Sequence, residues 1–121
     1  QEICDFLFKI KQKVKPTCVF VNSSDLHQDH HVSNMECQRT FRDISLIEFN
    51  IERSTMYSKP SFFIKLSKQE ILHKIKSLKH YNTYKNKNYF QSENILAQSK
   101  TMGIKIESPY CEAFNIISLI I

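Results

Sequence analysis

Apolar residues recur at helical spacing in several stretches of this chain, and the clearest stretch follows Ser67. Its apolar residues share one helical face: Ile71, Leu72, Ile75 and Leu78. Ser67 is a good N-cap residue, and Glu70, three positions later, completes a capping box. The pattern therefore predicts a helix over 67–80.

The first segment, 1–15, fits a helical face and also a strand. Its lysines and glutamines favour the helix, and Pro16 ends the segment in either case. A second helical pattern covers 34–52, with Ser33 and Glu36 at capping-box spacing, although part of 44–51 could instead be a strand.

Shorter apolar runs predict strands over 17–21, 62–66, 104–107 and 113–121. Ser92 is expected to cap a helix through about residue 101, with Gly103 at its C-terminal end. The polar stretches 22–34 and 80–90 are predicted to be irregular connections.

Together these elements predict an α+β fold, with two or three helices packed on a small antiparallel sheet. The alternative is a small all-α helical bundle built from the four helical stretches. The length of 121 residues fits one small domain, 1–121. Because the chain begins at Gln1, a processed chain or a fragment is also expected.

Gly103 is the only glycine, which bears directly on catalytic motifs. Phosphate-binding loops and nucleophile elbows need glycines, and none of their sequence motifs is present. The sequence therefore predicts a chain that is not an enzyme and binds no cofactor.

The four cysteines are Cys4, Cys18, Cys37 and Cys111. An even number in a short chain permits three disulfide pairings and favours an oxidising, extracellular compartment. Asn22 begins an Asn-Ser-Ser glycosylation sequon, which agrees with secretion. The alternative is an intracellular chain with four free thiols.

A cluster of histidines and aspartates occupies residues 25–31. Imidazole and carboxylate groups bind zinc and related ions, so His27, His30, His31 and Asp29 are candidate metal ligands. Cys18 and Cys37 flank the cluster and could complete a tetrahedral site. The spacing matches no zinc-finger pattern, and the alternative is a solvated polar loop.

Positive charge is concentrated in residues 57–90, which carry eight lysines among several tyrosines. Lysines neutralise phosphates and aromatic rings stack on bases. The candidate polyanion-binding residues are Lys74, Lys76, Lys85, Lys87 and Tyr84. The alternative is a solvated helix face.

The sequence as a whole predicts a small basic binding protein, secreted and acting through a protein partner. One alternative is a polyanion- or nucleic-acid-binding protein that uses 57–90. Another is the product of an open reading frame with no evolved biochemical role. No membrane span is expected, because the longest apolar stretch, 116–121, is far shorter than the roughly 20 residues that a span needs.

Overall fold

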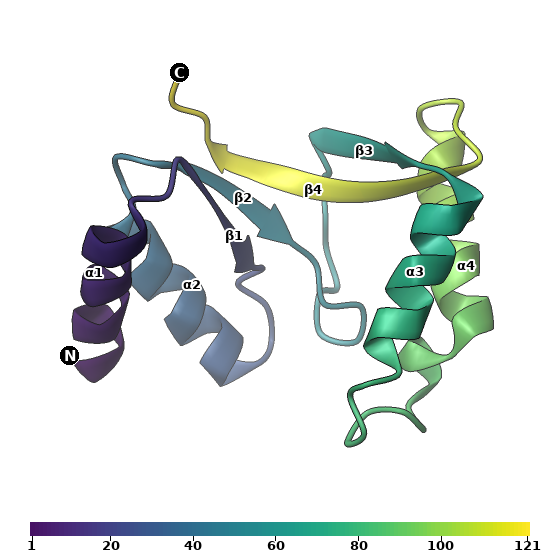
Figure 1. The fold of residues 1–121 in the computed structure, drawn as a ribbon, viewed down its shortest axis with the longest axis horizontal. Coiled ribbons are helices and arrows are strands. Elements are labelled where there is room, and N and C mark those ends of the chain that lie inside the picture. The colour runs from purple at the N-terminus through teal and green to yellow at the C-terminus, as the bar shows by residue number, and fades with distance from the viewer. The chain divides into compact units, whose positions relative to one another are not determined.

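A computed structural model describes all residues, 1–121, and contains four helices, one short 3-10 helix and four strands (Figure 1). In chain order they are α1 (Glu2–Val14), β1 (Cys18–Asn22), α2 (Gln28–Thr40), β2 (Ser45–Phe49), β3 (Phe62–Leu66), α3 (Lys68–Leu78), η1 (Asn88–Phe90), α4 (Ser92–Ile104) and β4 (Tyr110–Ser118). The strands form a sheet in the order β1-β2-β4-β3. The predicted α+β class is confirmed and the all-α alternative is wrong. There are four helices, and the sheet is mixed because β1 and β2 run parallel.

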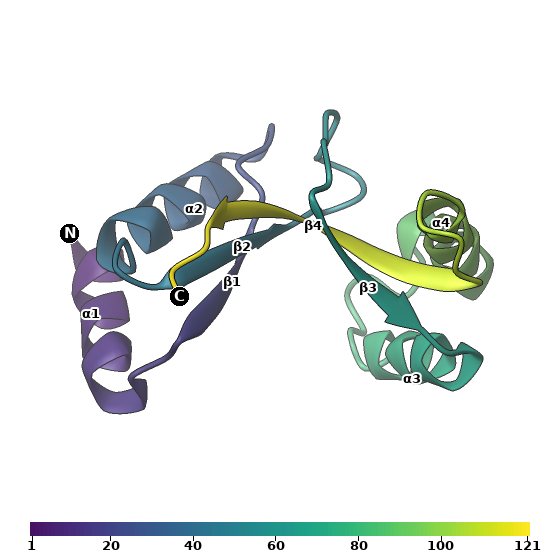
Figure 2. The same ribbon diagram turned by 90° about the horizontal axis from the view of Figure 1, so that it is seen from above.

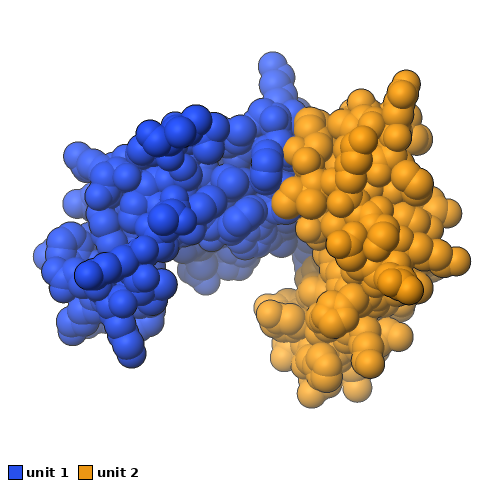
Figure 3. All heavy atoms as spheres, turned by 45° about the horizontal axis from the view of Figure 1, so that its top comes forward, with its two compact units in different colours: residues 1–62, 114–121 blue, residues 63–113 orange.

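The chain divides into two compact units, coloured separately in Figure 3. Unit 1 contains residues 1–62 and 114–121, and unit 2 contains residues 63–113.

Unit 1 is organised around a β1-α2-β2 connection between parallel strands. Val19 of β1 pairs with Leu46 of β2, and Phe49 of β2 pairs with Phe114 in the second half of β4. Helices α1 and α2 pack side by side, as Figure 2 shows, and α2 also contacts β1. The buried apolar residues of this unit are Val21, Phe41, Leu46 and Ile47.

Unit 2 is built on α3 and α4. Its buried core consists of Ile71, Ile75 and Ile95, and four partly buried residues pack against it: Leu66, Leu78, Leu96 and Tyr110. The predicted capping box is present. Ser67 Oγ accepts a bond from the Glu70 N–H at 3.2 Å, and the Ser67 N–H donates to Glu70 Oε2 at 2.6 Å. The predicted capping box and three of the four predicted apolar contacts of α3 are therefore confirmed, whereas Leu72 is half-exposed and lies outside the core.

Helix α2 begins six residues before the predicted start at residue 34. His27 takes the N-cap position, and its Nδ1 accepts a bond from the Asp29 N–H at 3.2 Å. Ser33 caps nothing; its hydroxyl donates to Asn22 Oδ1 at 2.7 Å. Much of the predicted loop 22–34 is therefore helical, and the alternative strand assignment within 44–51 is the correct one.

Helix α4 runs through Gly103, and the predicted strand over 104–107 is wrong. Gly103 has no left-handed backbone angle; the positive φ after the helix belongs to Glu107. The glycine is instead required by a close approach. A Cβ atom at this position would lie 2.2 Å from the backbone oxygen of Ser108.

Candidate functional site

The polar segment after β1 and the turn after β2 lie at the same end of these two strands. Because β1 and β2 are parallel, their carboxyl ends meet at one edge of the sheet. In open α/β sheets, ligands bind outside the carboxyl ends of the strands. The histidine and aspartate cluster of residues 25–31 therefore occupies a position where such sheets place binding sites.

Asp25 is the centre of this cluster, and its side chain is only 2% exposed. Oδ1 accepts a bond from the His27 N–H at 2.8 Å, and Oδ2 accepts one from Ser54 Oγ at 2.7 Å. His30 Nδ1 lies 2.9 and 3.0 Å from the two carboxylate oxygens, and Ser23 Oγ donates to Oδ2 at 3.3 Å. The carboxylate is thus held from both strand ends.

These donors control the ionisation of Asp25. Burial raises its pKa, but bonds from the His27 backbone and from the Ser54 and His30 side chains, together with the charge of His30, outweigh burial. They lower the pKa from 3.8 to about 2. Asp25 is therefore a carboxylate at neutral pH, despite its burial.

The carboxylate fixes the orientation of His30. Since an ionised carboxylate only accepts hydrogen bonds, Nδ1 of His30 must carry the ring proton. In the neutral ring this leaves a lone pair on Nε2, which makes no hydrogen bond within the chain. The His30 side chain is 24% exposed. This ring can therefore accept a metal ion or a proton through Nε2.

His27 stacks on His30 but has the opposite tautomer. The ring centroids are 4.5 Å apart and the ring planes differ by 25°. Because Nδ1 of His27 accepts the Asp29 N–H, the proton of its neutral ring lies on Nε2. The pair thus combines one nitrogen acceptor with one N–H donor.

Residues of the turn after β2 form hydrogen bonds that hold the groups around Asp25 in place. Thr55 Oγ1 lies 2.6 Å from Ser23 Oγ and accepts the Ile51 N–H at 3.0 Å. Asn34, one of the few buried polar residues, donates from Nδ2 to Asn22 O at 2.7 Å and ties α2 to the end of β1. The site is therefore part of a connected hydrogen-bond network.

The four predicted metal ligands do not form one cluster. The structure brings together His27 and His30, whereas His31 Nδ1 pairs with Ser24 Oγ at 2.8 Å and the Asp29 side chain is exposed. No group of three or more histidine, cysteine, aspartate or glutamate side chains is arranged to hold a metal ion. Asp25, which was not among the predicted ligands, is the carboxylate that meets His30.

The predicted disulfides are wrong, because all four cysteines are free. Cys4 lies on α1 with its Sγ 3.7 Å from Thr40 Oγ1, Cys18 lies on β1, Cys37 on α2, and Cys111 is buried in β4. Without disulfides, the argument for secretion from the cysteine count no longer holds.

The thiol of Cys37 also does not favour the tetrahedral metal site suggested for Cys18 and Cys37. Burial, with a smaller effect from the charge of Glu36, raises the pKa of Cys37. A thiol with a raised pKa is a poorer source of the thiolate that binds zinc.

Asn22, the glycosylation candidate, uses its side-chain amide inside unit 1. Nδ2 donates to His30 O at 2.9 Å and to Ser23 O at 3.0 Å, and Oδ1 accepts from Ser33. A glycan on Nδ2 would disturb these bonds.

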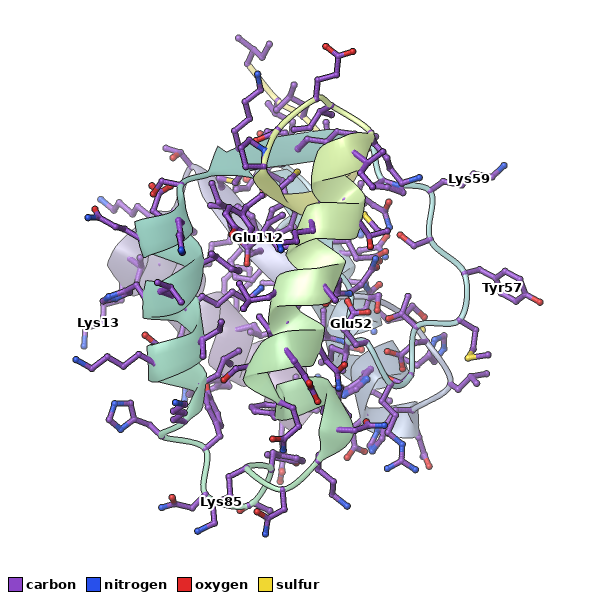
Figure 4. All side chains as sticks on the ribbon, turned by 90° about the vertical axis from the view of Figure 1, so that its right-hand side faces the viewer. Lys13, Glu52, Tyr57, Lys59, Lys85 and Glu112 are labelled. Carbon is purple, nitrogen blue, oxygen red and sulfur yellow. The ribbon has the colours of Figure 1, made fainter.

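The polyanion-binding candidates are distributed over two parts of unit 2. Lys74 forms an ion pair with Glu112, and Lys76 is exposed on α3. Tyr84, Lys85 and Lys87 lie together in the connection between α3 and α4, where Figure 4 labels Lys85.

None of the helices has both the length and the apolar character needed to cross a membrane, in agreement with the sequence.

The comparisons with known proteins establish the fold and no more. The sequence matches no protein-family model and no curated protein. The structure is similar to the crystal structure of the conserved protein TT1542 from Thermus thermophilus, with a TM-score of 0.81 and 17% sequence identity. The match covers 99% of this chain and 60% of the TT1542 chain. This chain thus shares its fold with part of a longer protein.

Proposed function

We propose that this chain contributes His30 as a ligand to a divalent metal site of the zinc class, with Asp25 as the residue that positions the ring. The observation that carries the proposal is the contact of the buried Asp25 carboxylate with His30 Nδ1, which leaves Nε2 as the coordinating nitrogen. Histidines that bind metals in proteins commonly donate their other ring N–H to a carboxylate.

The position of the cluster supports the same proposal. The segments that follow the two parallel strands meet at this cluster, and Ser54, in the turn after β2, donates a hydrogen bond to Asp25. Polar residues that converge from two strand ends are typical of binding sites in α/β sheets. A solvated loop would not require a carboxylate that is almost completely buried.

His27 gives this site a second chemical capacity. Its Nε2–H lies in a ring stacked on the proposed ligand, so it can donate a hydrogen bond to a molecule bound at the metal. A bound zinc ion would polarise such a molecule or lower the pKa of a water ligand. The chemistry supported best is therefore metal-assisted binding or hydrolysis of a polar group.

This chain supplies one ligand to the proposed metal site. Since no three suitable side chains converge, the other coordination positions are assigned to water, to a bound molecule or to another polypeptide. We expect the isolated chain to bind zinc weakly for the same reason.

Zinc titration followed by the ring nitrogen signals of the histidines tests this proposal. The His30 Nε2 resonance should shift in a saturable way, and His30→Gln should weaken zinc binding at least tenfold. His31→Gln is the matched control, because His31 lies on the same helix and contacts Ser24 instead of Asp25. Asp25→Asn should weaken binding by about 10- to 100-fold.

Equal losses in His30→Gln and His31→Gln would contradict the proposal, because they would indicate adventitious binding by surface imidazoles. Zinc binding that does not involve Nε2 of His30 would contradict it as well. The protein partner expected from the sequence stays a prediction; a pull-down with the folded chain would test it separately.

A further inference from the structure

An aromatic cluster lies in the connection between α3 and α4. Phe90 is its central ring, with centroid distances of 6.1 Å to Tyr81, 5.6 Å to Tyr84 and 5.3 Å to Tyr89. Tyr84 stacks on Phe90 with an angle of 21° between their planes. Tyr81 is 58% exposed and Tyr84 is 44% exposed, so both present ring surface to solvent.

Lysines without ionic partners accompany these rings. Lys79, Lys85 and Lys87 are exposed, and none of them forms a salt bridge within the chain. By contrast, Lys74 on α3 is paired with Glu112. We call the exposed set the tyrosine–lysine surface: Lys79, Tyr81, Tyr84, Lys85 and Lys87.

The backbone that carries this surface is fixed by hydrogen bonds. Gln91 Nε2 donates to Lys85 O at 3.0 Å and to Lys87 O at 3.2 Å. Asn94 Nδ2 donates to Asn88 O at 2.6 Å. The backbone beneath the rings and lysines is therefore held in place before any partner binds, which reduces the entropic cost of binding.

Charge is distributed unequally between the two units. Unit 2 contains nine lysines and four glutamates, which gives a net charge of +5, the same as the whole chain. Unit 1 is therefore neutral. A partner that binds unit 2 through the tyrosine–lysine surface should be negatively charged.

We propose that the tyrosine–lysine surface binds single-stranded nucleic acid. Exposed tyrosine rings offer planar faces on which unpaired bases stack, and the unpaired lysines neutralise the phosphates between them. An acidic protein would use the lysines but would not need the exposed, preordered rings. Double-stranded DNA hides its base faces, so single strands fit this surface better. The proposal is independent of the metal site, which lies in unit 1.

Fluorescence anisotropy with labelled oligothymidylate and the full chain tests the proposal. Binding should be saturable and should weaken about 20-fold between about 50 and 200 mM salt, as expected for three neutralised phosphates on a single strand. Tyr84→Ala should weaken binding at least about fivefold, because it removes one stacking platform. Tyr84→Phe keeps the ring and should bind like the wild type.

The matched controls are Tyr57→Ala and Lys59→Ala, which remove a tyrosine and a lysine from the loop between β2 and β3 (Figure 4). Tyr57 is 95% exposed and makes none of the aromatic contacts described above. Both variants should bind as the wild type does. A thermal melt of each variant verifies that it is folded.

Three results would overturn the proposal. The first is the absence of saturable binding at low salt. The second is binding that Tyr84→Ala leaves unchanged. The third is equal affinity for heparin, a polyanion without bases, combined with equal losses in the control variants. The last result would indicate polyanion binding by lysines throughout the chain, without base stacking and without a specific role for the tyrosine–lysine surface.

Discussion

Replacing Asp25 by Asn removes one negative charge with almost no change in shape, and its cost can be worked out from the structure. The folded-state pKa of about 2 lies below the ordinary value of 3.8, so the native contacts favour the ionised form. The difference corresponds to about 2 kcal/mol of stability at neutral pH. Asn resembles the protonated carboxyl group, so Asp25→Asn should lose at least this amount. The new amide N–H₂ would also face the donors Ser54 and His30.

The pH dependence distinguishes this explanation from a simple packing defect. Because the folded pKa is depressed, the stabilisation is present above the unfolded pKa and is lost as the pH falls through the folded pKa. The charge contribution of Asp25 should fall to about half at pH 3. Urea unfolding of wild type and Asp25→Asn in the presence of a chelator, between pH 7 and pH 3, measures the difference in free energy. A difference that is absent at pH 7, or that stays constant down to pH 3, would refute the assignment.

Three further predictions test the packing and helix capping of unit 2 by thermal or urea unfolding. Gly103→Ala should destabilise the protein by about 2 kcal/mol or more, because its Cβ would clash with the Ser108 backbone; a stabilised variant would show that the helix-propensity gain prevails. Ile71→Ala removes a fully buried side chain and should cost about 2–5 kcal/mol, whereas Leu72→Ala, which truncates a half-exposed neighbour, should cost less than about 1 kcal/mol. Equal costs would contradict the assigned helix face. Ser67→Ala removes the capping box and should cost about 1 kcal/mol, and Ser67→Asp should retain most of the stability.

Helix α3 could be predicted because its signals are local and agree with one another. The cap, the capping-box glutamate and the apolar stripe all lie within residues 67–78. The sequence places helix α2 too late in the chain because this segment has no apolar stripe. Only Asn34 and Thr40 of this helix are buried. Its cap is His27, a residue type that does not indicate a helix start. Packing against α1 and β1, and not a local pattern, sets its position.

The candidate site was predicted only in part for a related reason. The histidine cluster is visible in the sequence, but the choice of Asp25 over Asp29 depends on Ser54. This residue is 29 positions away and reaches the site only because β1 and β2 pair in parallel. The cysteine count led to the wrong prediction of disulfides for a similar reason, since it gives the number of thiols and not the distances between them.

The edge position of β1 has a consequence for how this chain behaves among other polypeptides. Only β2 pairs with β1, so the backbone amides and carbonyls along its outer side have no neighbouring strand. Residues 18–22 contain no charge and no proline, the features that usually protect an open edge, and Phe20 is exposed there. The strand is thus a template for β-augmentation, in which an incoming strand extends the sheet. Such a strand would run beside the segment that leads to Asp25 and His30, and it would bring its own side chains to the edge where those two residues meet.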